Sequence, residues 1–147
     1  MRRNLRPDEL GNLLELPLNA ILAVRRRDGS VLQTPVWHRW TGSHFTFYIP
    51  AGDRKIEMLR RDPRMSLIVA DNAFPFRTMQ VEGTARLESR DFQARAMEIA
   101  APYVAAHDPE VPVAEYIGPA DGVVVEVEAD TVRAWDYLDA DFTPGSG

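Results

Sequence analysis

Most of the apolar, β-prone segments in the first third of this chain are separated by connections too short to hold a helix. Asp28-Gly29 joins segments 19–27 and 31–40, and Gly42-Ser43 leads from there into 44–49. Asp-Gly is a strong signal for a tight hairpin turn. Strands joined in this way leave too few helices for a layout of alternating strands and helices. The sequence therefore predicts a mainly β fold, a small barrel of roughly six to seven antiparallel strands.

The remainder of the chain adds further strands and short helices. Pro35 has no N–H to donate to a ladder, so the strand over 31–40 is expected to have an edge or a bulge there. Gly83 predicts a second bulge, and Ser89 is expected to cap a helix. The further strands are expected over 65–70, 77–88, 122–128 and 131–137. The helices are expected over 7–16, 54–62 and 90–103, with an irregular stretch over 107–119.

Length and composition limit the classes of protein to consider. A chain of 147 residues predicts one domain, residues 1–147, with 139–147 as a frayed tail. The net charge of -5 argues against a protein devoted to nucleic acid or to an anionic membrane. The chain has no cysteine, which excludes disulfides and thiolate chemistry. It has no signal-like N-terminus and no apolar stretch near the ~20 residues of a membrane span, so a cytoplasmic location is expected.

Residues 48–63 predict the end of a strand, a loop, and a helix that Asp53 caps. Arg54 and Lys55 would then lie in the first helical turn, where free N–H groups and the helix dipole favour an anion. Two cations there would repel the dipole unless an anion lay between them. Lys55 is the only lysine in the chain, and a compact, mobile charge suits a phosphate. These residues favour a phosphate site and a solvated helix start about equally.

The segment from Thr34 to Trp37 indicates a second part of a binding site. A strand interrupted by proline leaves main-chain groups unpaired and available to the polar edge of a planar ligand, and Trp37 adds a stacking surface. An edge strand with Trp37 in the core explains the segment equally well.

The other polar groups give weaker signals. His38, His44 and His107 are scattered without paired spacing, so no metal site is predicted. His38 is expected to be at the surface or to have a hydrogen-bonded structural role. No serine lies on a nucleophile elbow, and there is no dinucleotide or P-loop motif. The arginine run 25–27 is interpreted as solvated, and Arg60, Arg61 and Arg64 as a basic track or a solvated helix face.

From about Leu10 to Tyr137 the chain carries a series of motifs whose order and spacing are together specific. The motifs are Asn19-Ala-Ile-Leu-Ala-Val, Asp28-Gly-Ser, Thr34-Pro-Val-Trp37, Phe47-Tyr-Ile, Gly52-Asp-Arg-Lys55, Leu59-Arg-Arg-Asp-Pro-Arg-Met-Ser-Leu67 and Val81-Glu-Gly-Thr-Ala-Arg-Leu87. With them the chain resembles the flavin and deazaflavin oxidoreductase superfamily related to pyridoxamine 5′-phosphate oxidase. Within it, the chain most resembles the branch that depends on the deazaflavin coenzyme F-420.

The resemblance implies an FMN-binding type of split β-barrel and a homodimer with two cofactors across its interface. It implies an oxidoreductase that transfers hydride to or from a small organic substrate, with no side chain required as acid or base. The residues implied to bind F-420 or FMN are Thr34, Pro35, Val36 and Trp37, Tyr48, Ile49 and Pro50, Arg54 and Lys55 at the phosphate, and Thr78 or Gln80 from a neighbouring strand. Family members often have Ser or Thr in place of Asp53, and an acid beside a phosphate is unfavourable unless it faces away as a cap.

Two other functions remain open at this point. One is a split barrel that binds a flavin or a haem without turnover, since a fold does not fix a function. The other, which the net charge disfavours, is a barrel that binds single-stranded nucleic acid. The sequence does not fix the substrate, the direction of hydride transfer, or the choice between F-420 and FMN.

Overall fold

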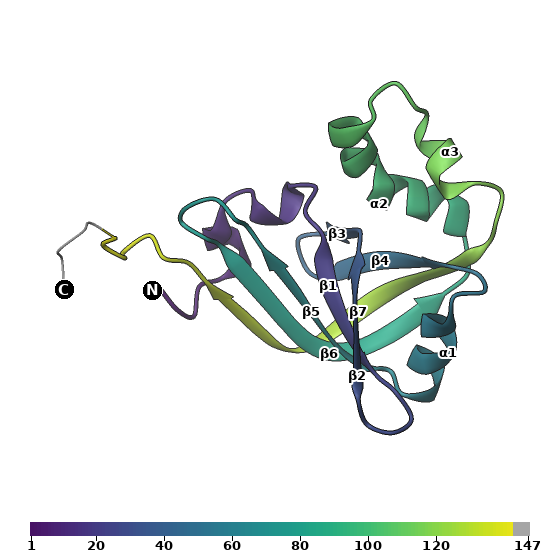
Figure 1. Cartoon of the computed structure of the whole chain (residues 1–147), viewed down its shortest axis with the longest axis horizontal. Coiled ribbons are helices and arrows are strands. Elements are labelled where there is room, and N and C mark those ends of the chain that lie inside the picture. Colours follow the sequence, from purple (N-terminus) through teal and green to yellow (C-terminus); the bar gives the residue numbers. More distant parts are fainter. Residues whose placement is uncertain (143–147) are drawn as a thin grey trace.

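The computed structural model describes residues 1–142, and within them seven strands form one antiparallel sheet (Figure 1). The strand order is β2-β1-β5-β6-β7-β4-β3. The strands are β1 (Ala20–Arg25), β2 (Val31–Val36), β3 (His38–Trp40), β4 (Phe45–Pro50), β5 (Arg64–Ala70), β6 (Thr78–Glu88) and β7 (Gly122–Trp135). The mainly β, antiparallel fold expected from the tight turns is confirmed.

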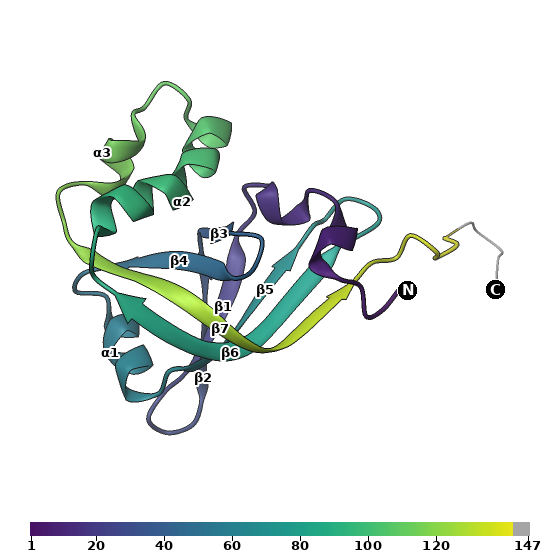
Figure 2. The same cartoon turned by 180° about the vertical axis from the view of Figure 1, so that it is seen from behind.

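The sheet is curled, and the chain connectivity shows why. β2 and β3 are the two edges of the sheet, yet only Trp37 separates them in the sequence. The edges must therefore come together at Trp37, which bends the sheet into an open, split barrel. Figure 2 shows the long strands β6 and β7 side by side on the face of the barrel toward the viewer. The prediction of one strand over 31–40 is wrong because of this break, whereas Pro35 does lie on an edge strand.

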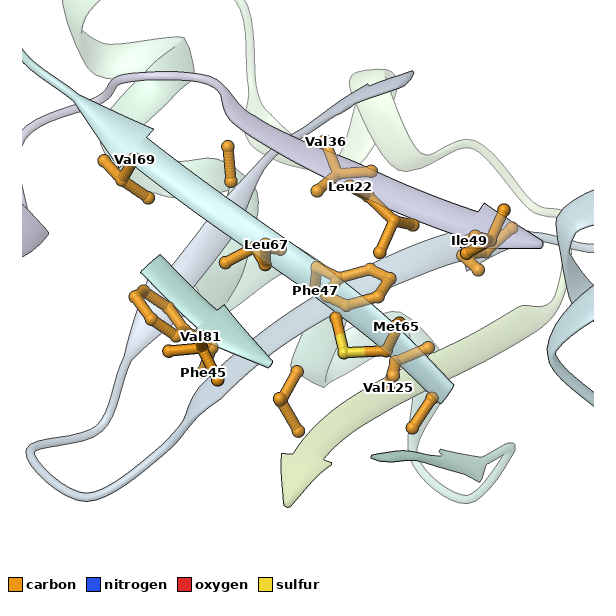
Figure 3. Close-up of a cluster of buried hydrophobic side chains, with 14 of the residues drawn as sticks. Leu22, Val36, Phe45, Phe47, Ile49, Met65, Leu67, Val69, Val81 and Val125 are labelled. Atoms are coloured by element: carbon orange, nitrogen blue, oxygen red, sulfur yellow. The ribbon is translucent and has the colours of Figure 1, made fainter. Parts of the chain in front are cut away.

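Inward-facing side chains of the strands fill the barrel. Strands such as β1 and β5 alternate buried and exposed positions, as strands with one face on a core do. Figure 3 shows Leu22, Phe47 and Met65 from three strands directed toward one another. Ile56 and Leu59 of α1 (Arg54–Arg61) join the same core, so that helix is anchored by its apolar side. Burial of each large apolar side chain contributes roughly 1.5–3 kcal/mol.

A helical arm lies outside the barrel over β4 (Figure 1) and has a small core of its own. The arm consists of α2 (Phe92–His107) and α3 (Val113–Ile117). Phe92, Ala96 and Ile99 are buried against Val124 of β7, and Trp37 packs against this second cluster. The residue that separates the two sheet edges therefore also contacts the arm.

The helix predictions need three corrections. The helix expected over 7–16 is two 3₁₀ turns, η1 (Pro7–Leu10) and η2 (Leu13–Glu15), because Gly11 between them has φ 61°. Ser89 does not cap α2: β6 extends to Glu88, and α2 begins at Phe92 after Asp91, whose side chain makes no capping bond. Part of the segment expected to be irregular forms α3.

One strand, β7, stands where two were expected over 122–128 and 131–137. β7 stays paired with β6 from Val124 to Trp135 because its extra residue, Asp130, bulges out opposite the register shift between Glu82 and Gly83. A Cβ on Gly83 would collide with the Glu128 carbonyl group, so the close approach of the two strands requires glycine. The predicted bulge at Gly83 is thereby confirmed.

The two ends of the described chain meet beside the end of β7 (Figure 2). Arg2 forms a bidentate pair with Asp136, and the N-terminal ammonium lies 2.7 Å from the Asp139 carboxylate. Asp139, the first residue of the predicted frayed tail, is thus paired, whereas 143–147 lie outside the described residues. No helix among residues 1–142 is long and apolar enough to cross a membrane.

Candidate cofactor site

A pocket of about 340 Å³, here called the β2–β4 pocket, lies at the ends of β2 and β4 and the start of α1. Seven of the eleven residues predicted from the sequence line it together. They are Pro35, Val36, Trp37, Tyr48, Ile49, Pro50 and Lys55. β2 and β4 are not neighbours in the sheet, so it is the curl of the barrel that brings these two segments to one pocket.

One end of the pocket is aromatic. The Trp37 ring stacks on Tyr103 of α2 with centroids 4.8 Å apart and planes at 11°, while Tyr116 of α3 lies 6.0 Å away, tilted by 41°. One face of Trp37 is therefore occupied by the protein itself. Trp37 both lines the pocket and packs on the arm, so it is only partly a core residue, and its contact with a ligand stays a prediction.

The other end of the pocket carries a cation and its partner. Asp53 caps α1, as predicted, by accepting a hydrogen bond from the Lys55 main-chain N–H at 2.9 Å. The second Asp53 carboxylate oxygen lies 2.7 Å from Lys55 Nζ. Burial opposes ionisation of Asp53, but the hydrogen bonds and charge of Lys55 outweigh it, so the pKa of this carboxyl is lowered. Asp53 therefore supplies a negative partner for the cation in the first turn.

Two predicted residues beside the pocket do not line it. Arg54 is exposed and faces a separate hollow that it shares with Arg26, Arg27 and Arg61, so Arg54 and Lys55 lie on different sides of the α1 N-terminus. Thr34 is half-buried on β2, paired with β1.

The other two predicted residues, Thr78 and Gln80, lie far across the sheet. In strand register, Pro35 faces Ile21, Ile21 faces Ile68, and Ile68 faces Gln80. Three ladder steps at about 4.8 Å each separate Gln80 from the pocket edge. Within one chain the structure does not bring Thr78 and Gln80 together with the other predicted site residues.

Sequence reasoning overlooked two residues that line the pocket, Asn19 and Tyr116. Asn19 immediately precedes β1 and belongs to the first motif of the resemblance, so a signal for it existed. Tyr116 comes from α3, in the stretch expected to be irregular, and donates a hydrogen bond to the Asp108 carboxylate at 2.9 Å. Its position depends on the fold of the arm, and no local pattern indicates it.

His38 corrects another expectation. Its side chain is buried, 4% exposed, and neither ring nitrogen has a hydrogen-bond partner among the described residues. Burial lowers its pKa to about 4, against a weaker opposite effect of the Leu18 carbonyl. The expected surface or hydrogen-bonded role is therefore wrong: His38 is a neutral core residue at pH 7. Within residues 1–142 no group of three His, Asp or Glu side chains is placed to hold a metal ion.

Comparisons with known proteins agree with this geometry. A family model described as pyridoxamine 5'-phosphate oxidase matches residues 7–136. The comparison with curated protein sequences found no match.

Solved structures share the fold. A conserved hypothetical protein, Rv2991 from Mycobacterium tuberculosis, is 20% identical with TM-score 0.72, covering 92% of this chain and 87% of its own. An F420 reductase is 24% identical with TM-score 0.66, and the match covers 82% of this chain and 93% of the reductase. A FAD-binding protein from Mesorhizobium loti is 17% identical with TM-score 0.65, and the match covers 90% of this chain and 93% of that protein. At these identities the structural likeness shows the fold alone.

Proposed function

Because the chain belongs to the pyridoxamine 5′-phosphate oxidase family, we propose that it is an oxidoreductase that binds a flavin-type cofactor in the β2–β4 pocket. The observation that carries the proposal is the meeting of an aromatic and apolar wall with a half-buried cation in one pocket. The F420 reductase and the FAD-binding protein of the same fold support a cofactor of this class.

The residues of the pocket fit such a cofactor. Tyr48 and Val36 give flat, apolar walls for a planar ring system, and the volume lies in the range of about 300–1,000 Å³ typical of ligand pockets. Pro35 leaves main-chain groups of an edge strand free for the polar edge of a ring. Lys55 at the opposite end is placed to meet a phosphate.

These residues indicate which parts of the reaction the cofactor and the protein would each supply. The bound cofactor would supply the hydride chemistry, with a small organic substrate as the other reactant. Pro35, Val36 and Tyr48 would orient the ring and exclude water from it, and Lys55 would fix the phosphate once it exchanges Asp53 for the new anion. Coenzyme F-420 is our first choice and FMN our second, because of the motifs that the chain shares with the F-420-dependent branch.

Titration of the purified protein with FMN and with F-420, followed by tryptophan fluorescence and visible absorption, tests the proposal. Trp37 lines the pocket, so a bound ring system should quench its fluorescence. The cofactor with the lower dissociation constant is then assigned. If neither cofactor binds at millimolar concentration, the proposed function is wrong.

We further propose that the functional unit is a homodimer in which the Thr78–Gln80 segment of a second copy completes the pocket. Exposed aromatic side chains support this: Phe74 is 55% and Phe76 38% exposed, where their rings contact Phe142. Stable dimers of this kind bury more than about 2,000 Å². Light scattering should give twice the chain mass at micromolar concentration, and Gln80→Ala should weaken cofactor binding. A monomer that binds cofactor with full affinity would refute the shared site.

A further inference from the structure

Arginines without an ion-pair partner gather in one region of the surface. Nine of the 16 arginines form an ion pair with a carboxylate among residues 1–142. The seven without such a pair are Arg3, Arg25, Arg26, Arg27, Arg54, Arg61 and Arg90. Four of these, here called the arginine cluster, line two adjoining hollows between the β1–β2 turn and α1: Arg26, Arg27, Arg54 and Arg61. Figure 1 shows the turn and the helix side by side at the lower end of the barrel.

Main-chain contacts hold two members of the cluster without neutralising them. Arg61 Nη2 donates to the Arg25 carbonyl at 2.7 Å, which ties α1 to the end of β1. Arg26 Nη1 donates to the Val31 carbonyl at 3.1 Å across the hairpin. Because these acceptors are uncharged, the guanidinium groups are positioned and keep their full charge.

The carboxylates nearest the cluster are engaged elsewhere. Asp28 accepts hydrogen bonds from the Ser30 hydroxyl at 2.6 Å and the Ser30 N–H at 2.9 Å. Asp62 forms a bidentate pair with Arg64, with bonds of 2.9 and 2.8 Å. The residues that line the two hollows are thus five arginines, these two aspartates and Met58. In a chain of net charge -5, this is a local excess of positive charge.

We propose that the arginine cluster is a second binding site, separate from the β2–β4 pocket, for a small anion that carries two or more phosphate or carboxylate groups. The hollows measure about 550 and 360 Å³ and share Arg26, Arg27 and Arg61, so an elongated anion would span both. The planar guanidinium fork matches phosphate and carboxylate oxygens in bidentate fashion. A single charge would leave most of the cluster unpaired, which favours a multivalent ligand.

Calorimetric titration of the full chain with tripolyphosphate and with citrate, at constant ionic strength, tests the site. The variant Arg26→Gln/Arg27→Gln removes two cluster charges and should weaken binding about tenfold or more. The control Arg3→Gln/Arg90→Gln removes the same charge from two exposed, unpaired arginines outside the cluster and should bind like the wild type. The single variant Arg27→Gln, which removes a side chain that forms no hydrogen bond or ion pair among residues 1–142, should show a smaller loss. The probe that binds more tightly assigns the phosphate or the carboxylate class.

Four outcomes would overturn the proposal. The first is that the wild type binds neither probe. The second is an equal loss of affinity in both double variants, which would indicate nonspecific attraction. FMN or F-420 displacing tripolyphosphate one for one would make the cluster part of the cofactor site. A single-stranded oligonucleotide binding more tightly than either probe would indicate a nucleic-acid surface. Failure of the proposed function is distinguishable, because the protein would then bind tripolyphosphate and no cofactor.

Discussion

The two ends of the β2–β4 pocket differ in how firmly they are tied to the fold. At the cation end, Lys55 and Asp53 lie on the first turn of α1 and pair with each other. At the aromatic end, Trp37 stacks on Tyr103, whose hydroxyl accepts from the His38 main-chain N–H at 3.0 Å and donates to the Leu18 carbonyl at 2.7 Å. Substitutions at the cation end should therefore change cofactor affinity but not the stability of the fold, whereas substitutions at the aromatic end should change both.

The break between β2 and β3 explains this coupling. Where the chain passes from one sheet edge to the other, the His38 N–H and the Leu18 carbonyl are paired with the Tyr103 hydroxyl instead of a strand. Tyr103 is 2% exposed, and burial raises the pKa of its hydroxyl to about 12, so it stays protonated and able to donate. The arm is thus bonded to the barrel at the point where the pocket begins.

The largest effect is expected from lowering the pH, through His38, which follows Trp37 in the chain and whose ring lies edge-on to Tyr103. The pKa of its imidazole is about 4 in the folded protein, against an ordinary value of 6.5, so protonation of His38 favours the unfolded chain. Its contribution to stability is complete above pH 6.5 and is lost as the pH falls toward 4. The loss amounts to about 3 kcal/mol. Urea unfolding at a series of pH values measures it, and His38→Leu should show a shallower loss over the same range. If the free energy of unfolding falls equally with pH in both proteins, His38 is not the cause of the loss.

The next effect is expected from Tyr103→Phe. This change leaves the His38 N–H and the Leu18 carbonyl without their partner, at roughly 1–3 kcal/mol for each buried group. We expect a loss of about 2–3 kcal/mol and weaker cofactor binding, because the Phe ring can still stack on Trp37 but is no longer hydrogen-bonded to the barrel. Tyr116→Phe, the control, removes an exposed hydrogen bond from the same pocket and should leave the free energy of unfolding nearly unchanged. If both variants melt like the wild type, the aromatic end is no more coupled to the fold than the cation end.

Lys55→Ala tests the cation end. A charged hydrogen bond contributes about 1.5–3 kcal/mol, so cofactor affinity should fall about ten- to a hundredfold. The melting temperature without cofactor should change little, because Asp53 still caps α1 and its carboxylate, 29% exposed, stays in contact with water after Lys55 is removed. Added salt should weaken wild-type binding more than that of the variant. Arg60→Ala, on an exposed face of the same helix, is the control. If Lys55→Ala binds the cofactor as tightly as the wild type, Lys55 is part of a solvated helix start and not a phosphate ligand.

Local patterns in the sequence predicted much of the barrel. The Asp28-Gly29 turn, the Asp53 cap, the edge strand at Pro35 and the bulge at Gly83 each depend on one or two residues whose backbone chemistry is restrictive. The break at Trp37 has no such signal, because its cause is closure of the barrel. The continuity of β7 likewise depends on the bulged residue Asp130, opposite the Glu82–Gly83 step of β6.

The site was predicted in part, for the same reason. The pocket residues on β2 and β4 could be named because they lie in short motifs. Tyr116 could not, since its place depends on how the arm folds back over the barrel. His38 alternates with Trp37 along the chain, but alternation does not say which side α2 covers. The position of Arg54 on the far side of α1 from Lys55 follows from the helix geometry and the neighbouring hairpin.

The smallest effect is the most specific, and it concerns Asp53→Asn. Asparagine caps a helix about as well as aspartate, so α1 should remain capped, with a loss of less than about 1 kcal/mol from the weaker dipole interaction. The change removes the carboxylate that lies 2.7 Å from Lys55 Nζ and would compete with a phosphate for it. The pair is half-buried, and with a contribution of about 1 kcal/mol from it, cofactor affinity should rise by up to about fivefold. Fluorescence titration measures the change, and the gain should vanish when Lys55→Ala is added. A gain that persisted without Lys55 would reflect general charge, and no gain at all would mean that Asp53 does not hold Lys55 back from a ligand.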